Sequence, residues 1–113
     1  MDNCLFCKIV RKEIPAKICY EDEKVMAFHD INPVAPVHIL VIPKEHIPSM
    51  NEVAPENAGL FGHMALVAKQ VSEEAGVAES GYRVVINNGP DSGQVVFHVH
   101  AHVIGGRALS NLC

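Results

Sequence analysis

The chain has 113 residues, of which 49% are hydrophobic and 19% charged, so one domain with a packed core is expected rather than a disordered segment. Thirteen acidic and nine basic residues give a formal charge of −4, which argues against a dedicated nucleic-acid-binding surface. No apolar run approaches the roughly eighteen residues that a membrane span requires, and the N-terminus lacks the layout of a signal peptide. We therefore expect a single cytoplasmic domain over residues 1–113, with neither a membrane nor a nucleic acid as partner.

The first third of the chain predicts a short helix and a hairpin. Apolar residues at helical spacing within residues 3–13 predict a helix that ends before Pro15, because the residue before a proline avoids the helical region. Two strands, at residues 17–20 and 24–29, flank a polar turn and form a hairpin. A loop at residues 32–36 follows, since it contains two prolines.

The rest of the chain predicts a buried strand, a long helix and two further strands. Residues 38–42 form a continuous apolar run, typical of a strand buried on both faces. The long helix begins at Pro55 and ends at Gly76, with apolar residues at three- and four-residue steps between them. The last strands are predicted at residues 81–87 and 95–104. This pattern indicates an α+β domain: a five-stranded antiparallel sheet covered by a helix, with one long and one short helix in all.

Three histidines, His98, His100 and His102, alternate with apolar residues in the last predicted strand. Strand side chains repeat with period two, so the imidazoles should project from one face. Three interpretations are open: polar residues on a solvated face, transition-metal ligands, or nucleophilic and acid–base chemistry near neutral pH. The glycine-rich segment 88–94 immediately before them can offer backbone N–H groups to an anion, which favours phosphorus chemistry over a bare metal site.

The tract His98-Val-His-Ala-His-Val-Ile104 resembles the signature of the histidine-triad superfamily. The segments similar to its nucleotide-binding (Hint-like) branch are residues 11–17, 27–31, 38–44 and 105–107. This similarity covers essentially the whole chain, which is identified as a single histidine-triad domain, 1–113, of the bacterial type with a C-x-x-C zinc site. The resemblance implies a five-stranded antiparallel meander with a main helix, and a homodimer with a ten-stranded sheet.

The resemblance also implies an activity. Family members bind purine nucleoside monophosphates and hydrolyse their phosphoramidates, such as an adenylate joined to an amine, through a nucleotidyl-histidine intermediate. His100 corresponds to the nucleophile, His102 is placed to donate to a phosphoryl oxygen or the departing group, and His38 resembles the upstream histidine that supports the site. The matching nucleotide contacts are Phe28 at the base, Asp30 at the ribose hydroxyls, and Asn87 and Gln94 near the phosphate, together with Gly93, Val95, Val96, His100 and His102.

Other roles compete for some of these residues. Phe28 suits a core position as well as base stacking, and Asp30 and Asn87 are typical turn residues. Val95 stands where some relatives carry serine, so only its backbone N–H can reach a phosphate. The tail after Arg107 lacks the aromatic residue that some relatives carry there.

Cys4 and Cys7 form a C-x-x-C motif. Without an export signal, reduced thiols or metal ligands are better interpretations than a disulfide. Zinc-bearing relatives use such a motif with an intervening histidine and the first triad histidine, which correspond here to Cys4, Cys7, His46 and His98. The hypothesis is one structural zinc ion per chain, in a site that the phosphorus chemistry does not require.

Other functions remain open besides a phosphoramidase that hydrolyses adenylate-amine compounds. One is a dinucleoside polyphosphate hydrolase, which belongs to another branch of the superfamily. A second is a nucleotide-binding module whose hydrolysis is incidental. A third is a β domain that uses the triad itself as metal ligands. The physiological substrate and the choice between adenosine and guanosine stay undetermined at this level.

Overall fold

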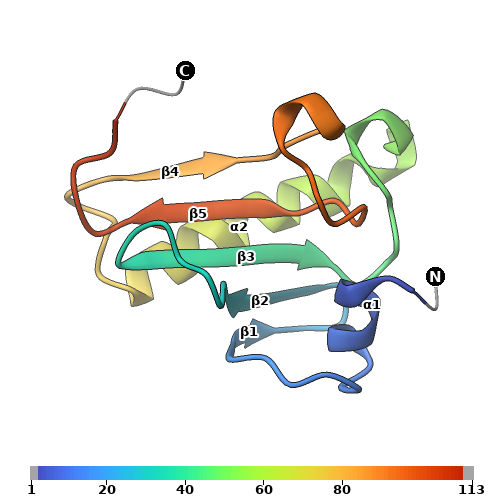
Figure 1. Ribbon diagram of the computed structural model, residues 1–113, viewed down its shortest axis with the longest axis horizontal. Helices are drawn as coiled ribbons and strands as arrows, with labels where there is room; N and C mark the ends of the chain where they lie inside the picture. Colours follow the sequence, from blue (N-terminus) through green and yellow to red (C-terminus); the bar gives the residue numbers. More distant parts are fainter. Residues whose placement is uncertain (1–2, 111–113) are drawn as a thin grey trace.

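A five-stranded antiparallel sheet forms the centre of the computed structural model, which describes residues 3–110 (Figure 1). Its strands are β1 (Ile18–Glu21), β2 (Val25–His29), β3 (Val37–Pro43), β4 (Tyr82–Val85) and β5 (Ala101–Gly105). The strand order is β1-β2-β3-β5-β4, and each neighbouring pair is antiparallel. The predicted sheet is confirmed, but the meander order is wrong, because β5 lies between β3 and β4.

Two α-helices and three short 3-10 turns accompany the sheet. They are α1 (Leu5–Val10), α2 (Ala58–Glu74), and the turns η1 (Met50–Glu52), η2 (Pro55–Asn57) and η3 (Pro90–Ser92). The predicted short and long helices are therefore both present. Within residues 3–110, neither helix has the length and apolar character needed to cross a bilayer.

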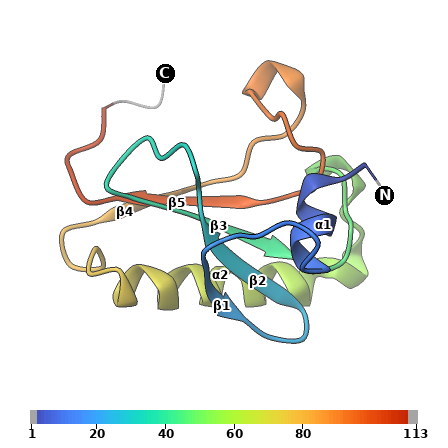
Figure 2. The same ribbon diagram turned by 60° about the horizontal axis from the view of Figure 1, so that its bottom comes forward.

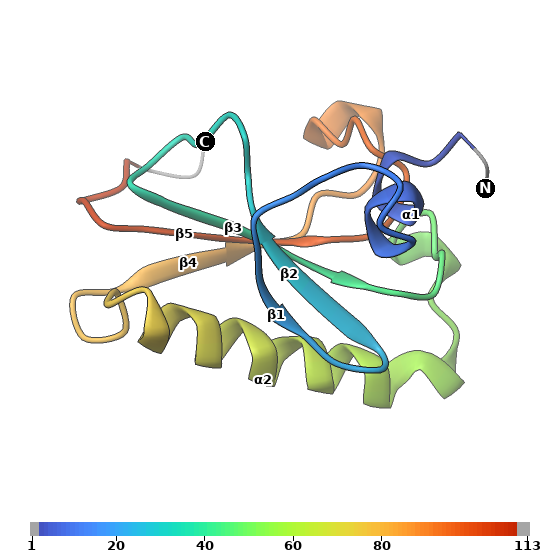
Figure 3. The same ribbon diagram turned by 90° about the horizontal axis from the view of Figure 1, so that it is seen from below.

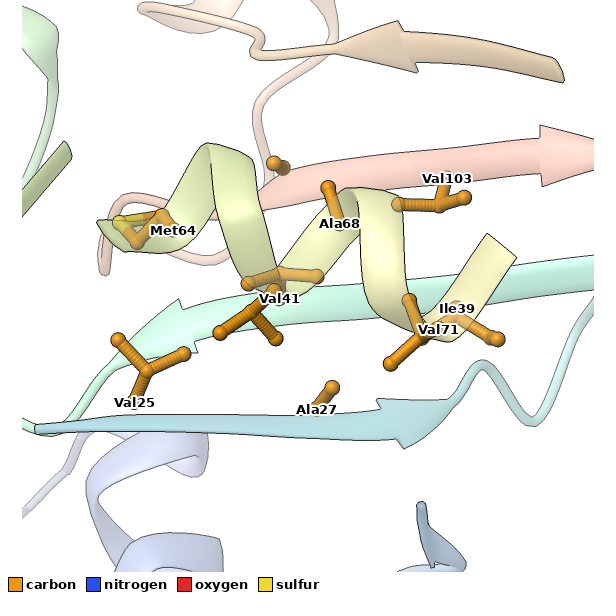
Figure 4. Packing of buried hydrophobic residues seen from close by; sticks show 10 residues of the cluster. Val25, Ala27, Ile39, Val41, Met64, Ala68, Val71 and Val103 are labelled. Carbon is orange, nitrogen blue, oxygen red and sulfur yellow. The ribbon is translucent and has the colours of Figure 1, made fainter. Parts of the chain in front are cut away.

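Helix α2 covers one face of the sheet and packs on it to form one hydrophobic core (Figures 3 and 4). The strands alternate, so every second residue of β2, β3 and β5 faces this helix. The core residues on this side are Val25, Ala27, Ile39, Val41, Ala101 and Val103 from the strands, and Met64, Val67, Ala68 and Val71 from α2. The β-branched residues suit the pleated surface, and each buried Val or Ile contributes roughly 1.5–3 kcal/mol.

Helix α1 lies against the opposite face of the sheet (Figures 2 and 3). Phe6 and Ile9 of this helix pack on the other set of alternating strand residues, which are Met26, Phe28, Leu40 and Ile42. Strands β2 and β3 are thus covered on both faces, and this explains their continuous apolar sequences. The same face of β2 leads to Asp30, so α1 and Asp30 end up on one side of the sheet.

The ends of α2 follow from local sequence. Its first predicted turn, at Pro55, is the 3-10 turn η2, in which the side chain of Asn57 accepts a hydrogen bond from the backbone N–H of Ala54 at 2.9 Å. At the other end, Gly76 has φ +80°, and the N–H of Val77 donates to the carbonyl of Ser72 at 3.0 Å. This is a glycine-terminated helix end, so the predicted stop at Gly76 is confirmed.

The last predicted strand, residues 95–104, is too long. Pairing of β5 with β3 runs from Gly105 opposite Val37 to Ala101 opposite Val41, and β5 begins there. The preceding backbone bonds elsewhere, since the N–H of Val99 donates to the carbonyl of Ile47 at 2.7 Å. His98 and His100 therefore lie just before β5 rather than within it. The strand predicted at residues 81–87 is likewise shortened to β4.

Candidate active site and metal-binding centre

A cavity of about 300 Å³ lies on the α1 side of the sheet, between α1 and the histidine segment. Its wall is mainly apolar, and the polar side chains that line it are those of His29, Asp30, Asn32, His100 and His102. A pocket with this composition is typical of a small-molecule site. The apolar wall includes Leu5, Phe6, Ile9, Ile14, Ala16, Phe28 and Leu40.

Most of that apolar wall was not predicted as part of a site. Leu5, Phe6 and Ile9 have the spacing of a core-facing helix, and that pattern does not reveal whether the helix also borders a cavity. Phe6 both packs in the core and borders the cavity. Its ring makes edge contacts with Phe28 at 5.5 Å and with His100 at 5.0 Å between centroids.

His100 is held as a neutral ring with a defined proton position. Its Nδ1 lies 2.7 Å from the backbone carbonyl oxygen of His98. A carbonyl can only accept, so Nδ1 carries the proton and Nε2 is the unprotonated nitrogen. Burial lowers the pKa of His100, although the bond to His98 and the nearby charge of Asp30 oppose this shift. An imidazole in this state can attack an electrophile with Nε2.

His102 and His38 lie next to the nucleophile candidate. The rings of His100 and His102 are 4.9 Å apart, and Nε2 of His38 is 2.9 Å from Nδ1 of His102. The carboxylate of Asp30 lies 3.4 Å from the same nitrogen of His38. Burial, together with the neighbouring rings of His100 and His38, lowers the pKa of His102 to about 4, although the charge of Asp30 opposes this shift. His102 is therefore neutral near pH 7.

Several predicted nucleotide contacts do meet at the cavity. Phe28 is buried, lines the cavity and packs on Phe6, so its core role and its site role coexist. Asp30 lines the same space, while its Oδ1 accepts a hydrogen bond from the backbone N–H of Asn32 at 2.8 Å. Val95 and Val96 complete this part of the wall, and Val95 is 84% exposed.

Three other predicted contacts are not among the cavity-lining residues of the described chain. Gln94 is buried, and its side-chain oxygen accepts from the N–H of Gly89 at 2.7 Å. Its side-chain nitrogen donates to the carbonyls of Pro48 at 2.9 Å and Val96 at 3.1 Å. Gly93, with φ +94°, closes the turn η3, and Asn87 lies just beyond β4. Gln94 thus shapes the loop that carries Val95 and Val96.

Four side chains predicted as metal ligands come together beside α1. They are Cys4, Cys7, His46 and His98, and their ligand atoms all lie within 4.8 Å of one another. Sγ of Cys4 is 3.4 Å and Sγ of Cys7 is 3.5 Å from Nδ1 of His98. Sγ of Cys7 is also 3.3 Å from Nδ1 of His46. The C-x-x-C motif has this shape because Cys4 caps α1, with its Sγ accepting from the N–H of Cys7 at 3.4 Å.

The donor set fits a zinc ion. Two thiols and two imidazoles make a Cys₂His₂ site, which is typical of structural zinc. His98 presents an unprotonated nitrogen, as a metal ligand must. Its Nε2 donates to the carbonyl of Pro43 at 2.7 Å, so Nδ1, which faces the cysteines, carries no proton. The fourth ligand, His46, has its ring 5.1 Å from that of His98.

The three triad histidines therefore have separate surroundings. His98 faces the cysteines, while His100 and His102 face the cavity. Among residues 3–110, the only other group with potential metal-ligand geometry is Asp30, His38 and His102. His100 belongs to neither group, which argues against the triad itself serving as one metal site.

The sequence model of the HIT domain matches residues 11–109. This chain belongs to the HIT family. It is 46% identical over 108 residues to the purine nucleoside phosphoramidase of Escherichia coli K12, covering 96% of this chain and 91% of that protein. It is also 49% identical over 109 residues to an uncharacterized HIT-like protein of Synechocystis, covering 96% of this chain and 95% of that protein.

Solved structures agree with this assignment. A HIT family hydrolase from Clostridium thermocellum superposes with a TM-score of 0.96 at 48% identity, covering 98% of this chain and 96% of that one. A HIT family hydrolase from Legionella pneumophila gives a TM-score of 0.94 at 44% identity, with 96% of each chain covered. The HIT fold and the family's hydrolase character are thus supported together. Cys4 and Cys7 precede the segment that matches the domain model, which is residues 11–109.

Proposed function

We propose that this HIT-family protein hydrolyses the P–N bond of purine nucleoside phosphoramidates, with His100 as the nucleophile. The observation that carries the proposal is the state of His100: its Nδ1 is bonded to the carbonyl of His98 at 2.7 Å, so Nε2 is left to attack within the cavity. The similarity to the phosphoramidase of E. coli supports the substrate class.

The cavity accounts for how a nucleotide would be held. The purine would lie against the apolar wall formed by α1 and β2, where Phe6 and Phe28 offer ring surfaces. The carboxylate of Asp30 would accept hydrogen bonds from the ribose hydroxyls. The phosphorus would then face His100, next to the backbone N–H groups of Val95 and Val96, which suit developing negative charge.

Catalysis would proceed in two displacements at phosphorus. Nε2 of His100 forms a bond to phosphorus while the P–N bond to the amine breaks, and the amine leaves with a proton taken from solvent. Water then attacks phosphorus, releases a proton to solvent, and breaks the bond to Nε2, which releases the nucleoside monophosphate. The intermediate carries a positive ring, and the carbonyl of His98 and the charge of Asp30 both stabilise it. His102 would donate a hydrogen bond to the phosphoryl group.

Trapping the intermediate tests this proposal. A labelled adenosine phosphoramidate is mixed with the protein, quenched rapidly, and the modified peptide located by mass spectrometry. We expect the label on His100, and its loss together with turnover in His100→Asn, whereas nucleoside monophosphate affinity stays within a few-fold. His63→Asn, on α2 and outside the cavity-lining residues, is the matched control. Label on another residue, or full turnover by His100→Asn, would contradict the assignment.

Substrate comparison separates the alternatives. Rates are measured on an adenosine phosphoramidate and on a diadenosine polyphosphate under the same conditions. A preference for the phosphoramidate supports the proposal, and a preference for the polyphosphate identifies a different hydrolase. Tight binding of nucleoside monophosphates with negligible turnover of both compounds would instead indicate a nucleotide-binding module.

We also propose that Cys4, Cys7, His46 and His98 hold one structural zinc ion. When bound, the ion would tie α1 to the segments that contain His46 and His98. Metal analysis of protein purified without chelator should find near-stoichiometric zinc, and a Cys4→Ser/Cys7→Ser double variant should lose it. Cys19→Ser, a thiol of β1 outside this group, should retain it. A metal-free wild-type protein would reject the site.

A homodimer is proposed through the edge strand β4. Val84 on this edge is 48% exposed and Leu66 on α2 is 65% exposed, whereas the other edge, β1, carries Glu21 in ion pairs with Lys12 and Lys44. Open edges of this apolar kind favour pairing with a second chain. Sedimentation should show a wild-type dimer that Val84→Arg converts to a monomer, while Ile18→Arg on β1 leaves it intact. A monomeric wild-type protein would reject it.

A further inference from the structure

The turn that follows β5 packs against the loop between β2 and β3 (Figure 1). Arg107 donates from Nη2 to the carbonyl oxygen of Val34 at 2.8 Å and from Nη1 to that of Ala108 at 2.9 Å. Gly106 lies so close to the loop that a Cβ there would be 2.9 Å from Cβ of Pro36. The turn therefore supports this proline-containing loop directly.

The loop between β2 and β3 contacts His38 through Val34, the residue whose carbonyl accepts from Arg107. The backbone N–H of Val34 donates to Nδ1 of His38 at 3.2 Å. An N–H group can only donate, so Nδ1 of His38 is unprotonated and the proton of the neutral ring is on Nε2.

The proton position of His38 determines that of His102. Nε2 of His38 is 2.9 Å from Nδ1 of His102 and farther, 3.4 Å, from the carboxylate of Asp30. Nδ1 of His102 consequently accepts, and its proton is on Nε2. His100 has the opposite arrangement, with its proton on Nδ1. Two adjacent cavity-lining rings thus carry opposite tautomers, one with a bare Nε2 and the other with an Nε2–H donor.

The same hydrogen bonds argue against a cation at Asp30, His38 and His102, although these side chains lie close enough to form a ligand group. Coordination through Nε2 of His38 would remove its proton while Nδ1 still accepts from Val34. That state is an imidazolate, which is far less favourable than a neutral ring at pH 7. These three side chains are better explained as a hydrogen-bonded series that fixes which ring nitrogens of His38 and His102 carry protons.

We propose that Arg107 is a positioning residue: by holding the carbonyl of Val34 it fixes the tautomer of His38, and through it the Nε2–H of His102 that faces the phosphoryl group. The part of this proposal that concerns catalysis rests on the proposed function. Burial lowers the pKa of both His38 and His102, so both rings are neutral near pH 7 and the choice of tautomer has consequences there.

Long-range ¹H–¹⁵N correlation spectra of the histidine rings test the proposal without reference to turnover. The wild-type protein should show protonated Nε2 in His38 and His102, and protonated Nδ1 in His100. Arg107→Met should give mixed tautomers in His38 and His102, and Arg107→Lys should restore part of the wild-type pattern. Arg83→Met is the matched control, because Arg83 also donates to a backbone carbonyl, that of Ser110, at 2.9 Å.

Kinetics provide the second readout. Arg107→Met should lower kcat on an adenosine phosphoramidate by about tenfold with little change in KM, since the donor is misplaced while the base pocket is intact. Val34→Pro removes the N–H donor itself within a loop that already contains two prolines, and should reproduce the tautomer change. Its fold is verified by the spectra of residues outside the loop.

Two results would overturn the proposal. One is a wild-type spectrum with protonated Nδ1 in His38. The other is unchanged tautomers of His38 and His102 in Arg107→Met, or in folded Val34→Pro. Failure of the proposed function is distinguishable, because a protein without turnover would still report the tautomers of His38 and His102 in its spectra.

Discussion

Replacing Gly106 by alanine tests the packing on which the arrangement of His38 depends. Gly106 has φ +96°, a conformation that costs an L residue about 1–2 kcal/mol. The added Cβ would also lie 2.9 Å from Cβ and 3.3 Å from Cγ of Pro36, and overlap with such a rigid ring adds about 1–3 kcal/mol. The expected loss of stability is therefore about 2–5 kcal/mol.

The effect on thermal unfolding follows from chain length. For 113 residues, the average unfolding entropy converts 1 kcal/mol to about 4 °C, so Gly106→Ala should lower Tm by about 8–20 °C. Gly76→Ala is the matched control, because Gly76 has φ +80° but no atom within 4 Å of an added Cβ. It should lower Tm only by about 4–8 °C.

Both variants are compared by calorimetry at one protein concentration, since oligomerisation would make Tm concentration-dependent. The difference between them isolates the contact with Pro36 from the backbone strain they share. Equal Tm values for Gly106→Ala and Gly76→Ala would refute the reasoning. The turn after β5 would then not be in close steric contact with the loop that contacts His38.

Three further substitutions probe the core, the hairpin and the cavity. Val71→Ala on the buried face of α2 should cost about 2–3 kcal/mol in a urea titration, whereas Gln70→Ala on the exposed face should cost less than about 0.5 kcal/mol. Burial alone would raise the pKa of Asp22, but hydrogen bonds from Tyr20, His63 and two backbone N–H groups outweigh it and hold the pKa well below its usual range. The ionised carboxylate of Asp22 therefore stabilises the fold above about pH 4, and this stabilisation is lost as the pH falls below that value. The Tm of the wild-type protein should thus decline more steeply than that of Asp22→Asn between about pH 4 and 2.5. Phe6→Leu should weaken nucleoside monophosphate binding several-fold by calorimetric titration, and unchanged affinity would place the nucleotide elsewhere.

One backbone feature connects the two centres of this protein. The carbonyl of His98 accepts from His100, while the ring of the same His98 faces Cys4 and Cys7. Phe6, located between those cysteines in sequence, contacts the rings of both histidines, at 5.9 and 5.0 Å. The residues that would hold zinc and the residue that would attack phosphorus therefore belong to one packed unit.

Local sequence determined much of this molecule. Helical spacing of apolar residues predicted α1 and α2, and Gly76 predicted the end of α2, because these signals act over a few residues and need no tertiary partner. Alternation in β2 correctly placed Phe28 and Asp30 on one face for the same reason. The histidine and cysteine motifs also predicted the side chains that meet at the cavity and beside α1.

Only the tertiary structure decided how those groups are used. Pairing with β3 determines that β5 starts at Ala101, and the loop partners of Val99 and Gln94 come from residues 47 and 48, far away in sequence. The tautomers of His38 and His102 likewise depend on Val34 and, through it, on Arg107, which is 73 residues away along the chain. Spacing rules describe neighbours along one element, whereas a hydrogen bond between distant segments exists only after the chain has folded.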